Sequence, residues 1–461
     1  MKRSLWLQEI AAELTPAPAL SGSREADVAI VGGGFVGLWT ALRLKELDPA
    51  CRVVILERDI CGGGASGRNG GFVMSWWPKI SSLAAQCGRD EALRLARASA
   101  AAIGEIEEFC IAHGIDAHFR RNGWLWTATS EAQRGAWVDV QATCARLGED
   151  VFQSLPASEV ARRAGSPQHL EGVIEASNAT VQPARLVRGL YRVAREQGVE
   201  IYEKTPVLNF ERGQPAVLHT PQGKVSARRV VLAHNAWAAE IPELRRTILP
   251  VTSTIVATPP IPERLERIGW TGGEAITDSQ LMVDYYRTTA DGRIAFGKGT
   301  GMISFASRVD ERFDDNPQLS RDTEEDFRRS YPQLADVPID CTWSGPIDRT
   351  YDSLPVFGHL DDAPHIFYGV GWSGNGVGPS RIGGRILASL ALGRDDEWSR
   401  CGLVGRKPKR FPPEPLRYFG GLMVRGAVQR KECAESRNER PGMLDKALSG
   451  FAPAGLEDKS L

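Results

Sequence analysis

The sequence predicts an α/β fold of mixed α and β content, in which a Rossmann-like βαβ domain is interleaved with a second domain built on a large antiparallel sheet. Two observations support this prediction. A strand, a helix and a second strand follow one another within residues 28–56. Residues 251–299 then carry a mostly β pattern, with a hairpin expected around residues 290–292. A chain of 461 residues is also too long to fold around one simple hydrophobic core, so two or three packing units are expected.

The first βαβ unit is defined by the spacing of its apolar residues. Residues 28–31 form a short, β-branched run that is typical of a buried parallel strand. Apolar residues in Phe35–Leu47 recur at close to helical spacing, and residues 53–56 form a second buried strand.

A glycine motif lies between the first strand and its helix. Gly32, Gly34 and Gly37 have GxGxxG spacing, and Glu57 ends the second strand. Glycines permit a tight turn and the close approach of the backbone to a pyrophosphate, which the positive N-terminus of the helix attracts. The Glu57 carboxylate suits the ribose hydroxyls of an adenosine and has the wrong sign for a 2′-phosphate. The unit is therefore predicted to bind a dinucleotide, with NADP disfavoured.

Turn residues and helix boundaries predict the later elements. Helices are predicted at residues 92–110, 186–197, 379–392 and 416–435, the third ending at Gly393. Strands are predicted at residues 123–128, 199–202, 207–210, 217–220, 230–233 and 367–370.

The overall composition limits the partners and the compartment. A formal charge of −1 gives no reason to expect binding to nucleic acid or to anionic lipid. The eight cysteines are scattered without a CxxC pair, which indicates reduced thiols in a cytoplasm. The N-terminal residues are unlike an export signal, and no uncharged apolar run approaches the roughly 18 residues that span a bilayer. We therefore expect a cytoplasmic protein without membrane or nucleic-acid partners, its oligomeric state open.

A second glycine-rich stretch, GGGASGRNGG at residues 62–71, contains six glycines. Ordering each glycine costs about 0.5–1 kcal/mol more than ordering an alanine. An ordered loop of this kind therefore needs a compensating interaction, and a flexible linker is the alternative. Ser66, Arg68 and Asn69 favour a ligand loop, because a linker does not need an Arg-Asn pair between its glycines. The loop is expected to line the diphosphate and the inner edge of a ring system.

These residues resemble a known family. The GxGxxG turn, Glu57 and GASGRNGGF (64–72) are similar to the D-amino-acid-oxidase superfamily of FAD-dependent amine oxidoreductases, especially its glycine-oxidase-like and γ-glutamylputrescine-oxidase-like members. The resemblance extends in order over about residues 27–393. It continues through TVQPARLVRGL (180–190), KTPVLNFE (204–211), VVLAHNAWA (230–238), WSGPIDRTYDSLPVFG (343–358) and FYGVGWSGNGVGPSRIGGRILA (367–388).

The resemblance implies FAD as the cofactor, held without a covalent bond. Cys341 is unsuited to covalent attachment because its spacing from Asp352 does not match the covalent type. The cofactor-binding residues implied by the motifs together are Gly32, Gly34, Phe35, Gly37, Glu57, Arg58, Ala65, Ser66, Arg68, Asn69, Gly70, Gly71, Phe72, Val207, Ala233, Asn235, Trp237, Gly345, Asp352, Gly371, Ser373, Gly374, Asn375, Gly376 and Val377.

The last glycine loop, residues 371–378, can be interpreted without the family. It leads into a helix with Pro379 at its first position, so backbone N–H groups and the helix dipole favour negative charge there. A reduced flavin carries such charge, and preorganised donors stabilise it as it develops. Related oxidases often have histidine at the position of Asn375, which leaves the role of this residue open.

No catalytic residue is assigned by the sequence. Tyr285 and Arg287 fall on one face of a predicted strand, and His234 is expected to pack rather than to act as a base. The substrate-side candidates are Trp76, Trp77, Tyr285, Tyr286, Arg287, Arg349 and Asn375. The aromatic residues could enclose an amine, and the arginines could bind an acidic group of the substrate. The seven histidines form no metal-binding pattern, so no metal is expected.

The resemblance implies FAD-dependent oxidative deamination, in which hydride passes from a small primary or secondary amine or amino acid to flavin N5. The imine product then hydrolyses to an aldehyde or oxo acid, and O2 or another acceptor reoxidises the flavin; an oxidase is favoured over a dehydrogenase. Three alternatives stay open: an N-methylated or phosphonate-bearing amine as substrate, a hydroxylase reduced by NAD(P)H, or a non-catalytic flavoprotein that binds FAD and only binds partners. The predicted domains are an FAD-binding domain (1–85, 160–240 and 343–400), a substrate domain (86–159 and 241–342) and a helical tail (401–461).

Overall fold

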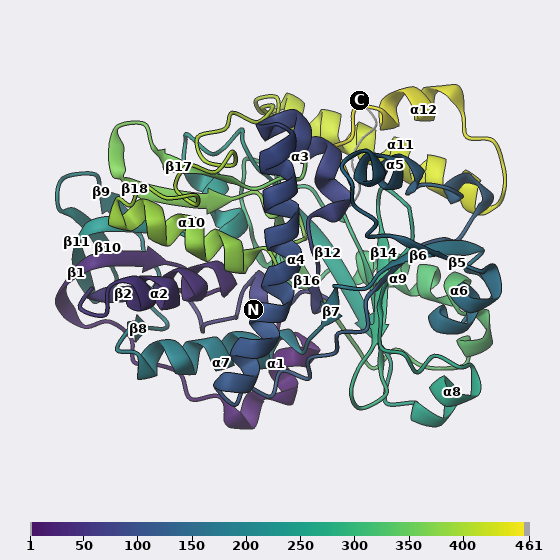
Figure 1. Cartoon of the computed structure of the whole chain (residues 1–461), viewed down its shortest axis with the longest axis horizontal. Coiled ribbons are helices and arrows are strands. Elements are labelled where there is room, and N and C mark those ends of the chain that lie inside the picture. Colours follow the sequence, from purple (N-terminus) through teal and green to yellow (C-terminus); the bar gives the residue numbers. More distant parts are fainter. Residues whose placement is uncertain (1, 456–461) are drawn as a thin grey trace.

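Two eight-stranded sheets organise the chain, and the computed structural model describes residues 2–455 of it (Figure 1). The first sheet has the order β17-β18-β11-β1-β2-β8, with β10 and β9 attached beside β11. The pairs β1·β11, β1·β2, β2·β8 and β11·β18 are parallel. Its strands are β1 (Gly22–Val31), β2 (Val53–Leu56), β8 (Glu200–Tyr202), β9 (Asn209–Glu211), β10 (Ala216–Thr220), β11 (Gly223–Leu232), β17 (Val356–Leu360) and β18 (Ala363–Val370).

The predicted βαβ unit is confirmed. Helix α2 (Phe35–Leu47) connects β1 to β2 with the predicted bounds, while β1 begins at Gly22, before the predicted strand. Helix α10 (Ser380–Leu392) lies beside α2 (Figure 1) and ends at Gly393, whose left-handed backbone caps it as expected. A Cβ atom at Gly384 would lie 2.7 Å from Trp39, so glycine is what allows the two helices to approach. Both helices begin at the same end of the sheet, where dinucleotides bind in such folds.

The second sheet is mostly antiparallel and has the order β16-β12-β15-β14-β13-β4-β6-β5. The pair β13·β4 is parallel. Its strands are β4 (Trp124–Ala128), β5 (Gln153–Leu155), β6 (Glu171–Glu175), β12 (Leu249–Ala257), β13 (Ala275–Thr277), β14 (Asp284–Thr288), β15 (Ile294–Lys298) and β16 (Cys341–Arg349). The hairpin predicted around residues 290–292 is the β14–β15 connection. The predicted fold class is therefore confirmed.

Helices cover both sheets. Helix α4 (Arg89–Ala112) contains the predicted helix at 92–110, and α7 (Pro183–Glu196) contains most of that at 186–197. Helix α9 (Pro317–Ser330) packs Phe327 onto the second sheet. The remaining helices before residue 400 are α1 (Leu5–Glu9), α3 (Ile80–Cys87), α5 (Val138–Arg146), α6 (Ala157–Ala164) and α8 (Pro262–Arg267), and β3 (Phe72–Val73) pairs with β7 (Ala179–Thr180).

The sheets do not follow the predicted domain boundaries everywhere. Strand β6 was placed with the cofactor-binding domain by a boundary at residue 160, yet it pairs with β4 and β5 in the second sheet. Strand β16 likewise pairs along its whole length with β12, across the boundary predicted at residue 343. The chain therefore crosses between the sheets at β16, which brings residues of the second sheet against the first.

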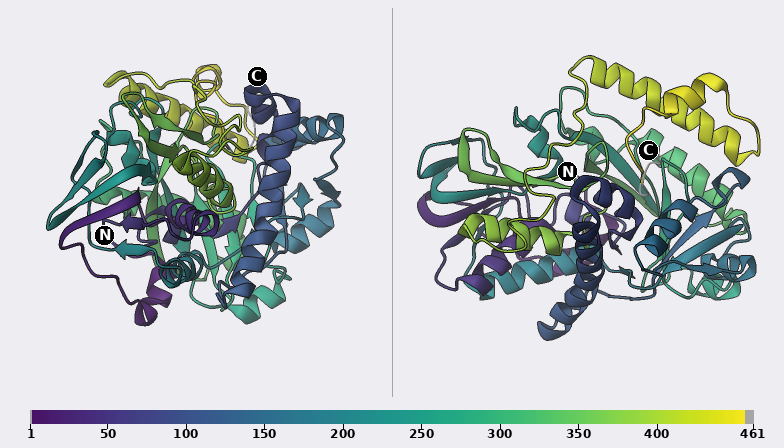
Figure 2. Two further views of the ribbon diagram at one scale, coloured as in Figure 1. Left: turned by 60° about the vertical axis from the view of Figure 1, so that its left-hand side comes forward. Right: turned by 45° about the horizontal axis from the view of Figure 1, so that its top comes forward.

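The tail forms the predicted helix α11 (Leu416–Ser436) and a further helix, α12 (Met443–Ser449). Figure 2 shows these two helices in yellow, next to each other on one side of the molecule. The end of the predicted tail, residues 456–461, lies outside the described residues. Among the helices of residues 2–455, none has the length and apolar character needed to cross a membrane.

Candidate active site

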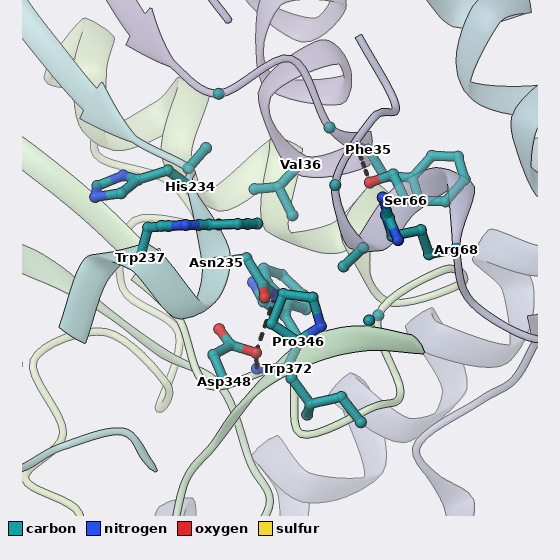
Figure 3. A pocket seen from close by; sticks show the side chains of 18 of the residues that line it. Phe35, Val36, Ser66, Arg68, His234, Asn235, Trp237, Pro346, Asp348 and Trp372 are labelled. Atoms are coloured by element: carbon teal, nitrogen blue, oxygen red, sulfur yellow. Dashed lines mark hydrogen bonds between the residues drawn. The ribbon is translucent and has the colours of Figure 1, made fainter. Parts of the chain in front are cut away.

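A cavity of about 680 Å³ lies between the two sheets (Figure 3). One end is formed by the glycine turn after β1, by residues 57–59 and by residues 206–212. The other end is formed by β12, β14 and β16 of the second sheet and by the loop at residues 372–377. A single hollow therefore connects the predicted dinucleotide turn with the face of the second sheet.

The glycine turn is shaped by contacts that exclude side chains. A Cβ atom at Gly32 would lie 2.6 Å from the Ala233 carbonyl oxygen, and one at Gly37 only 2.0 Å from the Gly32 oxygen. Gly32 also has a φ of +110°, a backbone conformation that favours glycine. Gly32 and Gly34 line the cavity, whereas Gly37 lies behind the turn and supports it.

Glu57 stabilises this turn from the end of β2. Its carboxylate accepts hydrogen bonds from the Gly33 N–H at 2.8 Å and from the Asp59 N–H at 2.9 Å. Burial raises the pKa of Glu57 above its ordinary value, because a charged carboxylate loses water there. The side chain also reaches the cavity wall, as expected for a group that binds a ribose.

The loop at residues 62–71 is ordered by its own polar side chains. Ser66 Oγ accepts from the Phe35 N–H at 2.9 Å and so satisfies a donor at the start of α2 (Figure 3). Asn69 donates to the Ala65 and Ser66 carbonyls at 3.0 and 2.9 Å and accepts from the Gly71 N–H at 2.7 Å. These contacts supply the compensating interactions that the glycine-rich sequence requires, so the loop is no flexible linker.

Arg68 connects the same loop to three distant segments of the chain. Its guanidinium donates to the carbonyl oxygens of Gly63 (3.0 Å), Ser344 (2.9 Å) and Lys2, and lies 3.5 Å from the Asp314 carboxylate. The backbone carbonyl of Arg68 in turn accepts from the indole N–H of Trp343 at 2.8 Å. Arg68 lines the cavity as expected, but its donors hold backbone carbonyls, so its main effect is to shape the wall.

Asp348, near the end of β16, connects two other walls of the cavity. Its carboxylate accepts from the backbone N–H groups of Gly371 (2.6 Å) and Trp372 (3.0 Å), and from the Asn235 side-chain amide at 3.1 Å (Figure 3). Burial raises the pKa of Asp348 to about 7. The sequence did not single out Asp348. Its neighbour Asp352, which was expected here, forms an ion pair with Arg406 at 2.6 Å and lies outside the cavity lining.

Most of the predicted cofactor-binding residues meet at this cavity. Those that line it are Gly32, Gly34, Phe35, Glu57, Arg58, Ala65, Ser66, Arg68, Asn69, Gly70, Phe72, Val207, Ala233, Asn235, Trp237, Gly345, Ser373, Gly374, Asn375, Gly376 and Val377. Gly37, Gly71, Asp352 and Gly371 lie behind the wall. Gly71 is required there because a Cβ atom would lie 2.1 Å from the Val181 oxygen, and Gly371 because one would lie 2.4 Å from the Thr350 side chain.

Several buried polar atoms of the wall have no hydrogen-bond partner among the described residues. They include His234 Nδ1, Asn235 Oδ1, Trp237 Nε1 and Asn375 Oδ1. Leaving such an atom without a partner costs about 1–3 kcal/mol. A wall with several of them is suited to a polar ligand that supplies the missing partners.

The predicted substrate-side residues divide into two groups. Tyr285, Arg349 and Asn375 line the cavity. Trp76, Trp77, Tyr286 and Arg287 do not, and their expected place in the substrate wall is corrected: all four are buried in packed interiors. Sequence alternation correctly separated the two faces of β14 but could not show which aromatic residues the core would enclose.

The contacts of Tyr286 and Arg287 explain their positions. Tyr286 stacks on Phe296 with ring centroids 4.9 Å apart, on the face of β14 opposite to the cavity. Arg287 lies on the same face as Tyr285, but it donates to the Gly70 and Val181 carbonyls at 2.8 and 2.6 Å. It therefore supports the loop at residues 62–71 from behind and cannot reach a substrate in the cavity.

Further wall residues were not assigned from the sequence. They include Met74, Ser253, Thr277, Val283, Ile347 and Trp372. Their strands were largely predicted, but nothing in a short strand pattern shows which of its faces meets another domain. His234 also lines the cavity, and burial lowers its pKa to about 4, so its ring is neutral at physiological pH.

The described residues place no cysteine in the cavity wall and form no metal-binding cluster. Cys341 begins β16, away from the cavity lining, and burial raises the pKa of its thiol to about 11. No cysteine is among the described residues that line the cavity. Within residues 2–455, no group of three or more histidine, cysteine or acidic side chains is arranged to hold a metal ion.

Known proteins show the same sequence pattern and fold. A family model described as FAD dependent oxidoreductase (DAO) matches residues 27–390. γ-Glutamylputrescine oxidoreductase from Escherichia coli is 31% identical over 381 residues, covering 82% of this chain and 86% of that protein. The probable oxidoreductase OrdL from Haemophilus influenzae is 30% identical over 390 residues, covering 83% and 86%. The crystal structure of glycine oxidase from Geobacillus kaustophilus superposes with a TM-score of 0.67 at 22% identity, over 81% of this chain and 96% of that one.

Proposed function

This chain belongs to the DAO family of FAD-dependent oxidoreductases, and on this premise we propose that it oxidises the carbon–nitrogen bond of a small primary or secondary amine or amino acid. The observation that supports this most directly is the single cavity, which connects the dinucleotide turn with polar and aromatic groups of the second sheet. FAD bound there supplies the acceptor for the hydride that leaves the carbon next to nitrogen.

The wall fits FAD along its length. Glu57 is placed for the adenosine ribose, and the N-terminus of α2 behind Gly34 attracts the diphosphate. Asn235 and Asn375 offer amide oxygens that have no hydrogen-bond partner within residues 2–455, and these oxygens suit the N–H and hydroxyl donors of the cofactor. We propose that FAD is held by these contacts without a covalent bond, which is consistent with the position of Cys341 outside the wall.

Two hydroxyl groups are placed to bind the amine. Tyr285 and Ser253 are hydrogen-bonded at 2.7 Å, and Ser253 also donates to the Lys298 carbonyl at 2.9 Å. Because the Ser253 hydroxyl donates its only proton to that carbonyl, it must accept the hydrogen bond from the Tyr285 hydroxyl. The Tyr285 oxygen can then still accept a hydrogen bond from a ligand. Burial holds the pKa of Tyr285 well above its ordinary value, so the phenol remains neutral. The site therefore accepts N–H groups without carrying a base of its own at this position.

The surroundings favour the deprotonated amine. An ammonium ion that enters this cavity loses its hydration water. Neutral groups such as Tyr285 and the His234 ring compensate for little of the lost hydration free energy. Loss of a proton before hydride transfer leaves a lone pair that assists the transfer, so orientation and desolvation account for the reaction. The imine product then hydrolyses in water to an aldehyde or oxo acid.

Product analysis tests this proposal. Amines, N-methyl amines, aminophosphonates and amino acids are incubated with the purified FAD-loaded protein under air. Carbonyl product, released ammonia or amine, and hydrogen peroxide are then measured. We propose an oxidase, so peroxide should equal carbonyl product; carbonyl product that appears only with an artificial electron acceptor would instead indicate a dehydrogenase. Rapid flavin reduction by NADPH, with no turnover of any amine, would support a hydroxylase and contradict the proposal.

A further inference from the structure

Arg349 lines the cavity at the end of β16, where an arginine could clamp a substrate carboxylate, yet its contacts lead elsewhere. Its guanidinium Nη1 donates to the carbonyl oxygen of Ala454 at 2.8 Å. The hydroxyl of Ser353 donates to the same oxygen at 2.8 Å, and the Ala454 N–H donates to the Tyr351 carbonyl at 2.9 Å. Three hydrogen bonds from the end of β16 and the residues after it therefore fix Ala454, on the C-terminal side of α12.

The other arginines of the cavity are also engaged. Arg68 donates to backbone carbonyls, as described above. Arg58 lies 5.0 Å above the Trp237 ring, and Arg212 is paired with Glu243 and Asp362. No lysine is among the described residues that line the cavity, and the His234 ring is neutral. Each arginine that lines the cavity within the described residues is therefore already held by other contacts, which leaves none placed to receive a carboxylate on the reacting carbon.

From these contacts we infer that Arg349 anchors the C-terminal segment instead of clamping a substrate carboxylate, and that the substrate is an amine with no carboxylate on the reacting carbon. This inference rests on the proposed amine oxidation and narrows its substrate class. It also assigns Arg349 as a positioning residue that acts on the cavity through the tail.

The tail makes further contacts with the strands that form the substrate end. The carboxylate of Glu432, on α11, accepts from the Met282 N–H at 3.0 Å, and Met282 precedes the wall residue Val283. Arg425 donates to the Thr300 carbonyl at 3.4 Å, next to the wall residue Gly299. The tail therefore contacts the wall residue Arg349 directly and the chain beside two further wall positions, Val283 and Gly299. The match to the family model ends at residue 390, so this support comes from a part of the chain that lies beyond it.

Matched substrate pairs test the substrate class. Each pair consists of an α-amino acid and the amine that remains after loss of its carboxyl group, such as ornithine with putrescine, lysine with cadaverine and phenylalanine with phenethylamine. Reduction of the bound flavin is followed without oxygen, and kcat and KM are determined separately. We expect the amine of a productive pair to exceed its amino acid by about 10- to 100-fold in kcat/KM, the size expected when a buried carboxylate lacks its partner. The reverse preference would overturn the inference, whereas no reduction by either class would contradict the proposed function itself.

Three variants and a control test the role of Arg349. Arg349→Gln should change kcat/KM for both members of a pair by the same factor, and Arg349→Lys should restore part of the loss. Ala454→Pro removes the N–H that bonds to Tyr351 and leaves the arginine intact, so it should reproduce the effect of Arg349→Gln on the amine. Met443→Ala, at an exposed position on α12, is the control and should leave the kinetics unchanged. A rise in KM that is confined to the amino acid in Arg349→Gln would identify a carboxylate clamp and overturn the inference.

Hydrogen exchange gives a measurement that is independent of turnover. In both Arg349→Gln and Ala454→Pro, amides of residues 451–455 should exchange faster than in the unaltered protein, while FAD content and the exchange of β1 and α2 stay the same. Unchanged exchange at residues 451–455 in both variants would show that Arg349 does not anchor the tail.

Discussion

The Asp348 carboxylate lies 3.1 Å from the amide nitrogen of Asn235, and this hydrogen bond connects the segment after β11 with the end of β16. The same carboxylate fixes the N–H groups of Gly371 and Trp372. One buried side chain therefore determines the relative positions of three cavity walls, one of which lies 113 residues away from it in the sequence.

Replacement of Asp348 should weaken FAD binding. In Asp348→Ala the three donors lose their acceptor, at a cost of about 1–3 kcal/mol for each buried donor that stays unpaired. We expect the Kd of FAD for the apoprotein to rise by about 10- to 100-fold, as measured by flavin fluorescence titration. Asp352→Ala is the control, because it breaks the ion pair with Arg406 behind the wall and should lower the melting temperature without this change in Kd. Equal Kd values for Asp348→Ala and the unaltered protein would contradict the account.

Loss of the Arg68 guanidinium should loosen the glycine-rich loop. Arg68→Ala removes three hydrogen bonds to carbonyls inside the protein, and Asn69→Ala removes the contacts that close the loop on itself. Both variants should retain less FAD after gel filtration or show slower flavin reduction. Arg312→Ala, on an exposed surface segment, serves as the control. Unchanged FAD content and reduction rates in both loop variants would restore the linker interpretation.

Glu57 should be required for the adenosine half of the cofactor. Glu57→Ala removes the acceptor of the Gly33 N–H as well as the ribose partner, so we expect little FAD in the purified protein. Glu57→Gln keeps one acceptor oxygen and should bind FAD with intermediate affinity. Flavin absorbance relative to protein absorbance measures both. A full FAD complement in Glu57→Ala would exclude the expected role.

Neighbouring tyrosines on β14 provide a matched pair. Tyr285→Phe removes a hydroxyl from the cavity and should raise KM for the amine by about 5- to 10-fold, the value of one hydrogen bond of about 1 kcal/mol, with little change in stability. Tyr286→Phe removes the hydrogen bond to His169 on the opposite face, so it should lower the melting temperature and leave KM unchanged. The opposite assignment of the two effects would show that the cavity lies on the other face of the strand.

Stability should depend on pH through Glu432. Burial raises the pKa of this carboxyl from 4.5 to about 7 in the folded protein. A raised pKa means that the folded state binds the proton more tightly, so this stabilisation is complete below about pH 4.5 and is lost as the pH rises through 7. Relative to Glu432→Gln, the protein should lose up to about 3 kcal/mol of unfolding free energy between pH 5 and 8.

Chemical denaturation at several pH values measures this difference. Glu439→Gln, at an exposed position, is the control and should parallel the unaltered protein at every pH. If Glu432→Gln also parallels the unaltered protein, Glu432 does not titrate as described.

The sequence predicted those parts of the site that depend on local geometry. A turn in which Gly32 and Gly37 exclude side chains, and a helix that starts directly behind it, leave a clear signature within a few residues. The loop at residues 62–71 could be identified for the same reason, because Ser66 bonds to the start of α2 and Asn69 bonds within the loop.

Contacts between distant segments were beyond that kind of prediction. Asp348 and Asp352 are both acidic and four positions apart, and only the fold shows that the first meets Gly371 while the second meets Arg406. Trp76 and Trp77 are large aromatic residues next to a ligand loop, yet they pack into the core around α4. The anchoring of Ala454 by Arg349 likewise depends on a tail whose path could not be read from its composition.

The central claim is tested most directly by mixing the purified, FAD-loaded protein with amines in the absence of oxygen and following the flavin absorbance near about 450 nm. The account predicts that this band bleaches with at least one primary or secondary amine, that one equivalent of carbonyl product forms per flavin, and that the band returns when oxygen or another acceptor is admitted. A band that stays unchanged with every amine and amino acid, in protein that carries a full complement of FAD, would contradict it.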